Sequence, residues 1–78
     1  MTTQPVQTIR DGALKATIWK NKGGKGEFYS VQFSRLYQDA EGHYQEAQTF
    51  SGLELLRLGR LARIAYSDIL RISKGGAL

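Results

Sequence analysis

Residues 28–54 read FYSVQFSRLYQDAEGHYQEAQTFSGLE, and this stretch decides the fold. Glu27–Tyr37 alternates in polarity as a β-strand does. The segment Asp39–Gly42 has Asp first and Gly fourth, as a type I turn prefers. A second alternating segment runs from His43 to about Phe50, and Ser51, followed three residues later by Glu, fits the capping box that begins a helix. The stretch predicts a strand, a turn, a second strand and a helix.

A further strand precedes this stretch and carries the only tryptophan of the chain. From Ala13 to Lys20, one face of the predicted strand is apolar, and the other carries Lys15, Thr17 and Trp19. The glycines after this strand predict a loose lysine-glycine loop over Lys20–Gly26 and a hairpin connection. Residues 1–12 are polar with one proline, so we expect a flexible or loosely paired N-terminal segment.

The strand at Glu27–Tyr37 has one apolar face in its middle, formed by Val31 and Phe33, which we predict to be core. Arg35 and Tyr37 continue the same face and are expected to be exposed to solvent. The opposite face of this strand carries Phe28, Ser30, Gln32, Ser34 and Leu36.

The predicted helix runs from about Leu53 to Ile72 and stops near a Gly-Gly pair. Its apolar stripe is wider than one seam, so we expect it to cover its own sheet and also to pack against the helix of a second copy. The residues predicted at this dimer contact are Leu55, Leu58, Ala62, Ala65 and Ile69.

With 78 residues, the chain is expected to form a single domain with a thin core, and it has no cysteine to support that core with disulfides. The predicted class is α+β, with a curved antiparallel sheet of about four strands over residues 13–50. A helix over 51–73 and a tail over 74–78 follow the sheet.

Catalytic chemistry has little support in the sequence. His43 is the only histidine, and no Ser-His-Asp or Cys-His set can be assembled. The sequence GGKGEF lacks the spacing of a phosphate-binding P-loop. The acids near the turn are too few for a calcium or magnesium site. We therefore expect a non-enzymatic protein without a cofactor, metal or small-molecule substrate.

The net charge of +4 is unevenly distributed, because basic blocks at residues 10–26 and 55–78 flank an acidic block at 27–54. Basic blocks favour polyanions. Single-stranded nucleic acid also needs aromatic faces on which bases stack. The combination of lysines and rings on a small sheet therefore predicts sequence-tolerant binding of single-stranded DNA. The residues predicted to bind are Lys15, Trp19, Lys20, Lys22, Lys25, Arg35 and Tyr37.

The segment KNKGGKGEFYSVQFSRLYQDAEGHYQEAQTFSGLELLRLGRL, with the turn DAEG after SRLY, resembles the positive cofactor four family of transcriptional coactivators and its bacterial and phage relatives. The resemblance covers roughly residues 13–65. The chain lacks the Ser- and acid-rich regulatory tail of eukaryotic members, which favours a compact, bacterial-type binder over a coactivator.

The resemblance implies a homodimer with packed helices and curved sheets that bind melted or looped DNA. It places Tyr37 at a base-stacking position, Lys20, Lys22 and Lys25 in or beside a basic loop, and Arg35 within one residue of a basic strand position. Two alternatives remain open from the residues. An RNA-binding module would use the same lysines and rings, and a protein-interaction module would use the apolar helix. Since no segment resembles a signal peptide or a membrane span, we expect a cytoplasmic, nucleoid-associated location.

Overall fold

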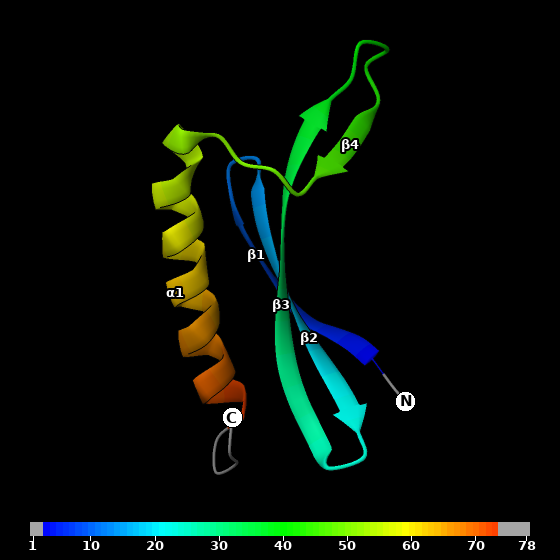
Figure 1. Ribbon diagram of the computed structural model, residues 1–78, viewed down its shortest axis with the longest axis vertical. Helices are drawn as coiled ribbons and strands as arrows, with labels where there is room; N and C mark the ends of the chain where they lie inside the picture. The colour runs from blue at the N-terminus through cyan, green and yellow to red at the C-terminus, as the bar shows by residue number, and fades with distance from the viewer. Residues whose placement is uncertain (1–2, 74–78) are drawn as a thin grey trace.

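The computed structural model describes residues 3–73, which fold as a four-stranded antiparallel sheet followed by one helix (Figure 1). The predicted α+β class is confirmed. The strands are β1 (Thr3–Asp11), β2 (Leu14–Gly23), β3 (Gly26–Gln38) and β4 (Tyr44–Ala47), and they lie in sequence order in the sheet. A short 3-10 turn (Gly52–Glu54) leads into α1 (Leu55–Ile72).

Residues 3–11 form a regular paired strand, where the sequence predicted a flexible or loosely paired segment. β1 pairs with β2 from Thr3↔Asn21 to Asp11↔Leu14, with one irregularity between Pro5 and Gln7. Its sequence is largely polar because β1 is an edge strand that contributes little to the core. Gly12, at φ 63, begins the two-residue turn into β2, and this conformation suits glycine.

The predicted lysine-glycine loop is also wrong in its extent. β2 continues to Gly23, which pairs with Gly26, so only Gly24 and Lys25 lie in the turn. Lys20 and Lys22 are strand residues opposite Tyr29 and Glu27.

The helix begins as the sequence predicts. The Glu54 carboxylate accepts a hydrogen bond of 2.8 Å from the backbone N–H of Ser51, which completes the capping box. α1 ends at Ile72, and the predicted Gly-Gly stop and the tail at 74–78 lie outside the described residues. No helix in residues 3–73 is long and apolar enough to cross a membrane.

The core lies between α1 and one face of the sheet. Leu14, Ala16 and Leu61 are buried together at its centre. Ala65, predicted to lie at a dimer contact, is 1% exposed and belongs to the buried face of α1 within the chain. That prediction is wrong for Ala65, because it lies four residues after Leu61 on the same side of the helix.

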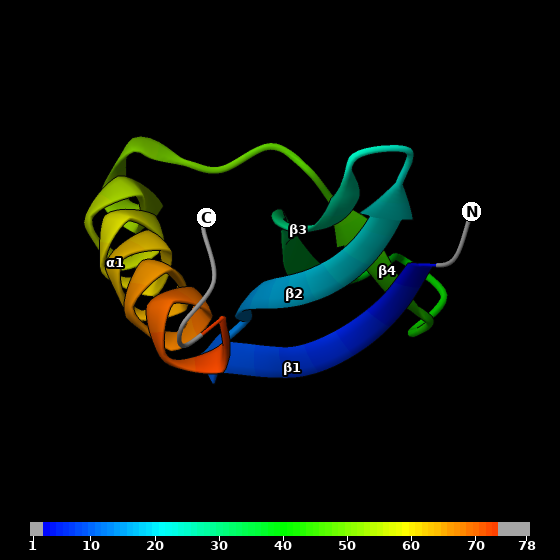
Figure 2. The ribbon, with the colours of Figure 1, turned by 90° about the horizontal axis from the view of Figure 1, so that it is seen from below.

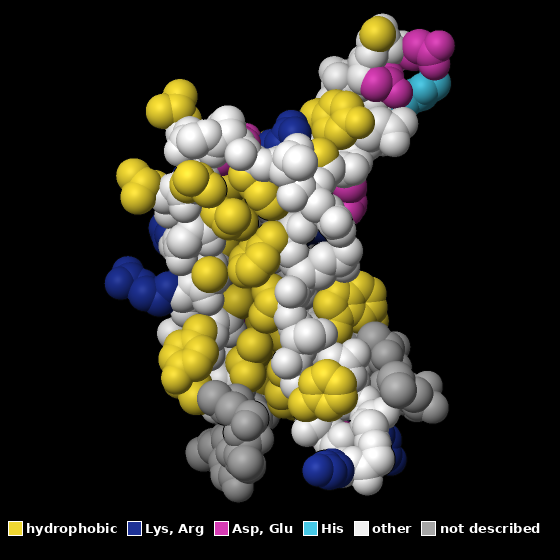
Figure 3. Space-filling view, viewed as in Figure 1, with side chains coloured by type: hydrophobic (Ala, Val, Ile, Leu, Met, Phe, Trp, Pro, Cys, Tyr) yellow, Lys and Arg dark blue, Asp and Glu magenta, His cyan; other side chains and the backbone are white. Residues whose placement is uncertain are grey.

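α1 leans towards β1, which leaves its other flank open. Arg60 lies 3.6 Å from Asp11 of β1, and Asp68 bonds to Gln7 of the same strand. At 100° per residue, Leu58, Ala62 and Ile69 fall on the opposite flank, above β3. Figure 3 shows hydrophobic side chains along this boundary between α1 and the sheet. We call this surface the apolar seam; its members are Val31, Phe33, Phe50, Leu58 and Ile69, all only partly buried.

The chain is thin and elongated. Its extents are 45 × 26 × 15 Å and its radius of gyration is 14.4 Å, against about 11.5 Å expected for a compact domain of this length. The end of β3 and β4 project as a two-stranded arm beyond the other strands (Figure 1), and β1 and β2 curve along their length (Figure 2).

A buried carboxylate links α1 to the edge strand. Asp68 is 6% exposed and accepts hydrogen bonds of 2.7 Å from the Gln7 amide and from Arg71. We expect Asp68→Ala to lower the free energy of unfolding by about 1–3 kcal/mol, because the Gln7 amide would be left without its acceptor. Urea denaturation measures this loss, with Ser67→Ala on the exposed side of α1 as the control. Equal stability of the two variants would contradict the linking role of Asp68.

Candidate nucleic-acid interface

No helix or strand of residues 3–73 covers the sheet face opposite α1, although Thr17 and Ser34 on this face are buried. Directly paired residues of antiparallel strands point to the same face, so the register divides the side chains into two sets. One set contains Leu14, Ala16 and Ile18 and lies under α1. We call the other set the open face; its members are Pro5, Thr8, Arg10, Lys15, Thr17, Trp19, Asn21, Phe28, Ser30, Gln32, Ser34, Leu36, Gln38, Tyr44 and Glu46.

Two cations lie side by side at one end of the open face. Arg10 is paired with Lys15 across β1 and β2. The Lys15 ammonium is 2.7 Å from the Glu46 carboxylate of β4. The hydrogen bond from Lys15 and its charge lower the pKa of Glu46, and Ser34 and Arg10 act in the same direction. The ion pair fixes the arm to β2 and reduces the charge that Lys15 offers to a ligand.

Two aromatic rings lie farther along the same face. Trp19 is half-buried between Pro5 and Ser30 on the neighbouring strands. Phe28 is 52% exposed and lies opposite Asn21. The residues around the rings are short and polar, and the Asn21 amide donates a hydrogen bond of 2.8 Å to the Ser30 hydroxyl. The rings are therefore accessible beside hydrogen-bonding groups.

The structure separates Arg35 and Tyr37 from this surface. Both lie on the α1 side of the sheet by register. The Arg35 guanidinium donates a hydrogen bond of 2.9 Å to the Thr49 carbonyl, lies 3.7 Å from Glu54, and is 5.5 Å from the centre of the Tyr37 ring. Arg35 thus holds the connection between β4 and α1.

The three lysines of the β2–β3 hairpin form a separate basic group. Lys20 and Lys22 lie on the α1 side by register, and Lys25 is in the turn. Lys20 is 3.2 Å from Glu27, whereas Lys22 and Lys25 have no ion pair with any carboxylate in residues 3–73. Figure 3 shows dark-blue Lys or Arg side chains at the hairpin end of the sheet. The seven predicted residues therefore occupy the open face, the hairpin end and the α1 side.

Sequence reasoning missed Arg10, Phe28, Ser30 and Gln32 as members of the open face. The alternation of β3 had placed Phe28, Ser30 and Gln32 together, but it did not indicate which face of β2 they join. A two-residue turn at Gly24–Lys25 fixes the register of β2 with β3. If this turn had been assumed, the sequence would have placed Phe28, Ser30 and Gln32 on the face of Trp19. Arg10 was missed because its segment was expected to be flexible or loosely paired, so no register was assigned to it.

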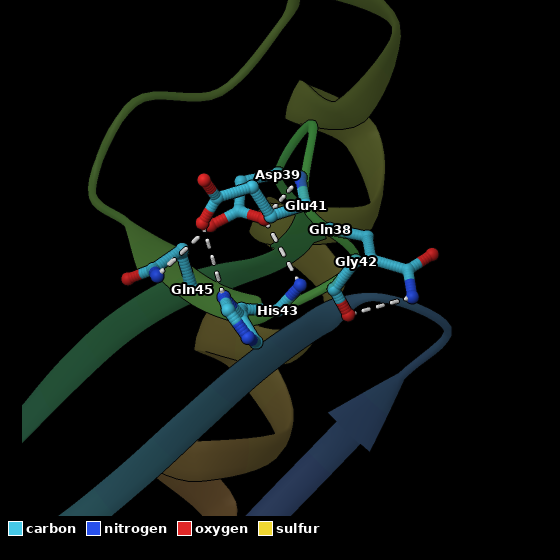
Figure 4. Close-up of polar contacts among 6 residues, drawn as sticks. All are labelled: Gln38, Asp39, Glu41, Gly42, His43 and Gln45. Carbon is cyan, nitrogen blue, oxygen red and sulfur yellow. Dashed lines mark hydrogen bonds and ion pairs between the residues drawn. The ribbon is translucent and has the colours of Figure 1, made fainter.

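The arm ends in a turn organised by one carboxylate (Figure 4). Asp39 accepts hydrogen bonds of 2.9 Å from the backbone N–H groups of Glu41 and His43 and one of 3.2 Å from the Gln45 amide. The bond from His43 is the main cause that lowers the pKa of Asp39. The His43 ring is exposed, 3.6 Å from Glu41. Within residues 3–73, no group of three His, Asp or Glu side chains is placed to hold a metal ion.

Comparison with known proteins adds no relative. No family model matches the chain, and no curated protein or solved structure matches it. The resemblance to the positive cofactor four family stays a prediction, and function is argued from the residues.

The acids of the arm predict a pH response. The folded-state pKa of Asp39 lies below its ordinary value of about 4, so its stabilisation is present above that pH and is lost as the pH falls through the lower, folded-state pKa. We expect the amide signals of Glu41 and His43 in an NMR titration to shift with a midpoint below about 4, and Asp39→Asn to abolish the shift. Amides of β2 serve as the internal control. A midpoint at or above the ordinary value would contradict the role of these hydrogen bonds.

Proposed function

We propose that the protein binds single-stranded nucleic acid, with single-stranded DNA as its ligand, on the open face and without catalysis. The observation that carries this proposal is the placement of the only tryptophan, Phe28 and two cations on one uncovered sheet face. Stacking on rings suits unpaired bases, whose faces are free, and it requires no particular sequence. Duplex DNA hides those faces, and the described part of the chain has no helix-turn-helix to read a groove.

The basic hairpin end extends the electrostatic part of the site. Lys22 and Lys25 have no ion pair with a carboxylate in residues 3–73 and lie at the same end of the sheet as Phe28, which faces Asn21 near the turn. A strand whose bases stack on Trp19 and Phe28 would direct its phosphates past this end of the sheet, where Lys25 lies in the turn and Lys22 on the α1 side. Arg10 and Lys15 then hold the backbone at the other end. Binding to such dispersed cations weakens with salt through counterion release.

Trp19 provides a direct reporter, because it is the only tryptophan. We expect its fluorescence to be quenched as oligo-dT is added, and Trp19→Ala to raise the dissociation constant roughly ten-fold, since stacking contributes about 1–3 kcal/mol per base. Ser67→Ala, on the exposed side of α1 and outside the apolar stripe, is the control and should bind normally. Unchanged affinity in Trp19→Ala, with its circular dichroism unchanged, would exclude stacking on Trp19.

Dimerisation is the second part of the proposal. The apolar seam continues over exposed residues of α1, of which Tyr66 is 58% exposed and Leu55 and Leu70 are also open. Gly59 and Ala62 lie in the middle of this stripe, and a side chain added at Gly59 meets no atom within 4 Å. Small residues there would allow a second helix to approach closely. We expect Ala62→Glu to lower the mass of the largest sedimenting species, because it blocks the helix contact, while Ser67→Glu does not. A monomeric natural protein at every concentration would contradict a helix contact.

A protein-interaction role is the second candidate, and one observation favours it. Leu53 and Leu56, at the start of the helix, are 93% and 88% exposed. Two leucines so open at one end of α1 suit a hydrophobic pocket on a different protein. Quenching of Trp19 by oligo-dT separates the two candidates, because a module that binds only proteins would leave its fluorescence unchanged.

A further inference from the structure

We infer that the free edge of β3 pairs with the same edge of a second copy, which joins two sheets into one. β3 (Gly26–Gln38) is much longer than β4 (Tyr44–Ala47). β4 pairs only with Arg35–Gln38 of β3. Within residues 3–73, no strand pairs with the outer side of residues 26–34.

The backbone groups on this edge can be identified from two hydrogen bonds. The Leu36 N–H donates to the Ala13 carbonyl, towards β2, and the Asp39 N–H donates to the His43 carbonyl, towards β4. Successive residues of a strand direct these groups to opposite sides. Odd-numbered residues of β3 therefore face outwards, and below β4 these are Glu27, Tyr29, Val31 and Phe33. Their N–H and C=O groups form a row that a strand can pair with.

Natural sheets protect such edges with charges, prolines or bulges. The other outer edge of this sheet, β1, has Pro5, an irregular register after it, and the charged pair Arg10 and Asp11. The β3 edge differs. Residues 28–34 read FYSVQFS, without a charge, a proline or a glycine, and the register with β2 is regular throughout. These residue types also favour strands. An unprotected edge of this kind indicates a partner strand.

The geometry of the edge selects a second copy and a register. A second copy can pair antiparallel with this edge through a two-fold axis. To pair along all of residues 26–34 without meeting β4, the axis must pass through their midpoint, Ser30. Tyr29 then lies opposite Val31 of the second copy on the α1 side, a favourable aromatic and β-branched pair. Phe28 lies opposite Gln32 on the open face. The outward-facing residues of both copies meet one another, as antiparallel pairing requires.

The exposed area of a single chain is consistent with such a contact. Its accessible surface is 5726 Å², about 1,000 Å² more than the roughly 4,700 Å² expected for a compact monomer of 8.7 kDa. A standard interface covers about 800 Å² per partner. The partly buried Val31 and Phe33 of the apolar seam lie on this strand, so the second copy would shield them.

Edge pairing has a consequence for binding, and this consequence rests on the proposed function. The two-fold axis places both open faces on the same side of a joined sheet, with the rings and cations of each copy in one continuous surface. The residues of this contact differ from those of the proposed α1 contact. Each chain then carries two self-complementary surfaces, the β3 edge and the exposed stripe of α1. Copies joined in turn by one contact and then the other would form an extended assembly along a strand of nucleic acid.

A single cysteine tests the pairing, because the natural chain has none. At the axis, the Cα atoms of Ser30 and its counterpart would be about 4.5 Å apart, which a disulfide can span. We expect Ser30→Cys to form a disulfide-linked dimer rapidly under mild oxidation, without nucleic acid. Thr8→Cys, on the open face of β1, is the matched control and should cross-link only slowly. Equal rates for the two variants would overturn the pairing.

A second variant removes one N–H donor of the β3 edge without removing a backbone hydrogen bond inside the chain. The Val31 N–H faces outwards, and proline is tolerated on such an edge. We expect Ser30→Cys with Val31→Pro to keep its circular dichroism and lose at least ten-fold in cross-linking rate; an undiminished rate would overturn the pairing. If this double variant does not fold, the comparison of Ser30→Cys with Thr8→Cys decides. Because these experiments contain no nucleic acid, failure of edge pairing and failure of the proposed binding are separate results.

Discussion

The one-sided core is the constraint on which the rest of the structure depends. A single helix packs its Leu61 on Leu14 and Ala16 of one sheet face, and the described chain has no layer on the other face. This arrangement leaves the opposite face free for a ligand. It also leaves the apolar seam and the outer edge of β3 at residues 26–34 open. Because the core is small, burial of these surfaces against a second copy, at the helix or at the β3 edge, would stabilise the fold.

The polar contacts position the parts that the core does not reach. The ion pair between Lys15 and Glu46 joins the arm to β2 across the open face, and Arg35 ties the chain after β4 to the start of the helix. Lys15 and Arg35 therefore differ in role, although both were expected to bind nucleic acid. Lys15 lies at the proposed surface with part of its charge already neutralised, and Arg35 stabilises the fold on the other side.

The local pattern of the sequence was sufficient for much of the fold. The alternation of β3, the turn at Asp39 and the capping box at Ser51 each depend on neighbouring residues, and all three are present in the structure. β1 has a local signal that the prediction did not use, because Asp11-Gly12 suits a two-residue hairpin turn into β2. The contact of β1 with α1, between Gln7 and Asp68, is distant in the sequence, and no local pattern reveals it. The site was only partly predictable for the same reason. Trp19 and Lys15 share a face within one strand, but the neighbours that β1 and β3 supply depend on the register.

The measurement that tests the central claim most directly is the fluorescence anisotropy of labelled oligo-dT titrated with the protein, beside a duplex of equal length. The titrations are made at low and at moderate salt. The account predicts binding to the single strand that weakens as salt is raised, with little binding to the duplex. Absence of binding to oligo-dT at low salt, or equal binding to the duplex, would contradict it and direct attention to the exposed leucines of the helix.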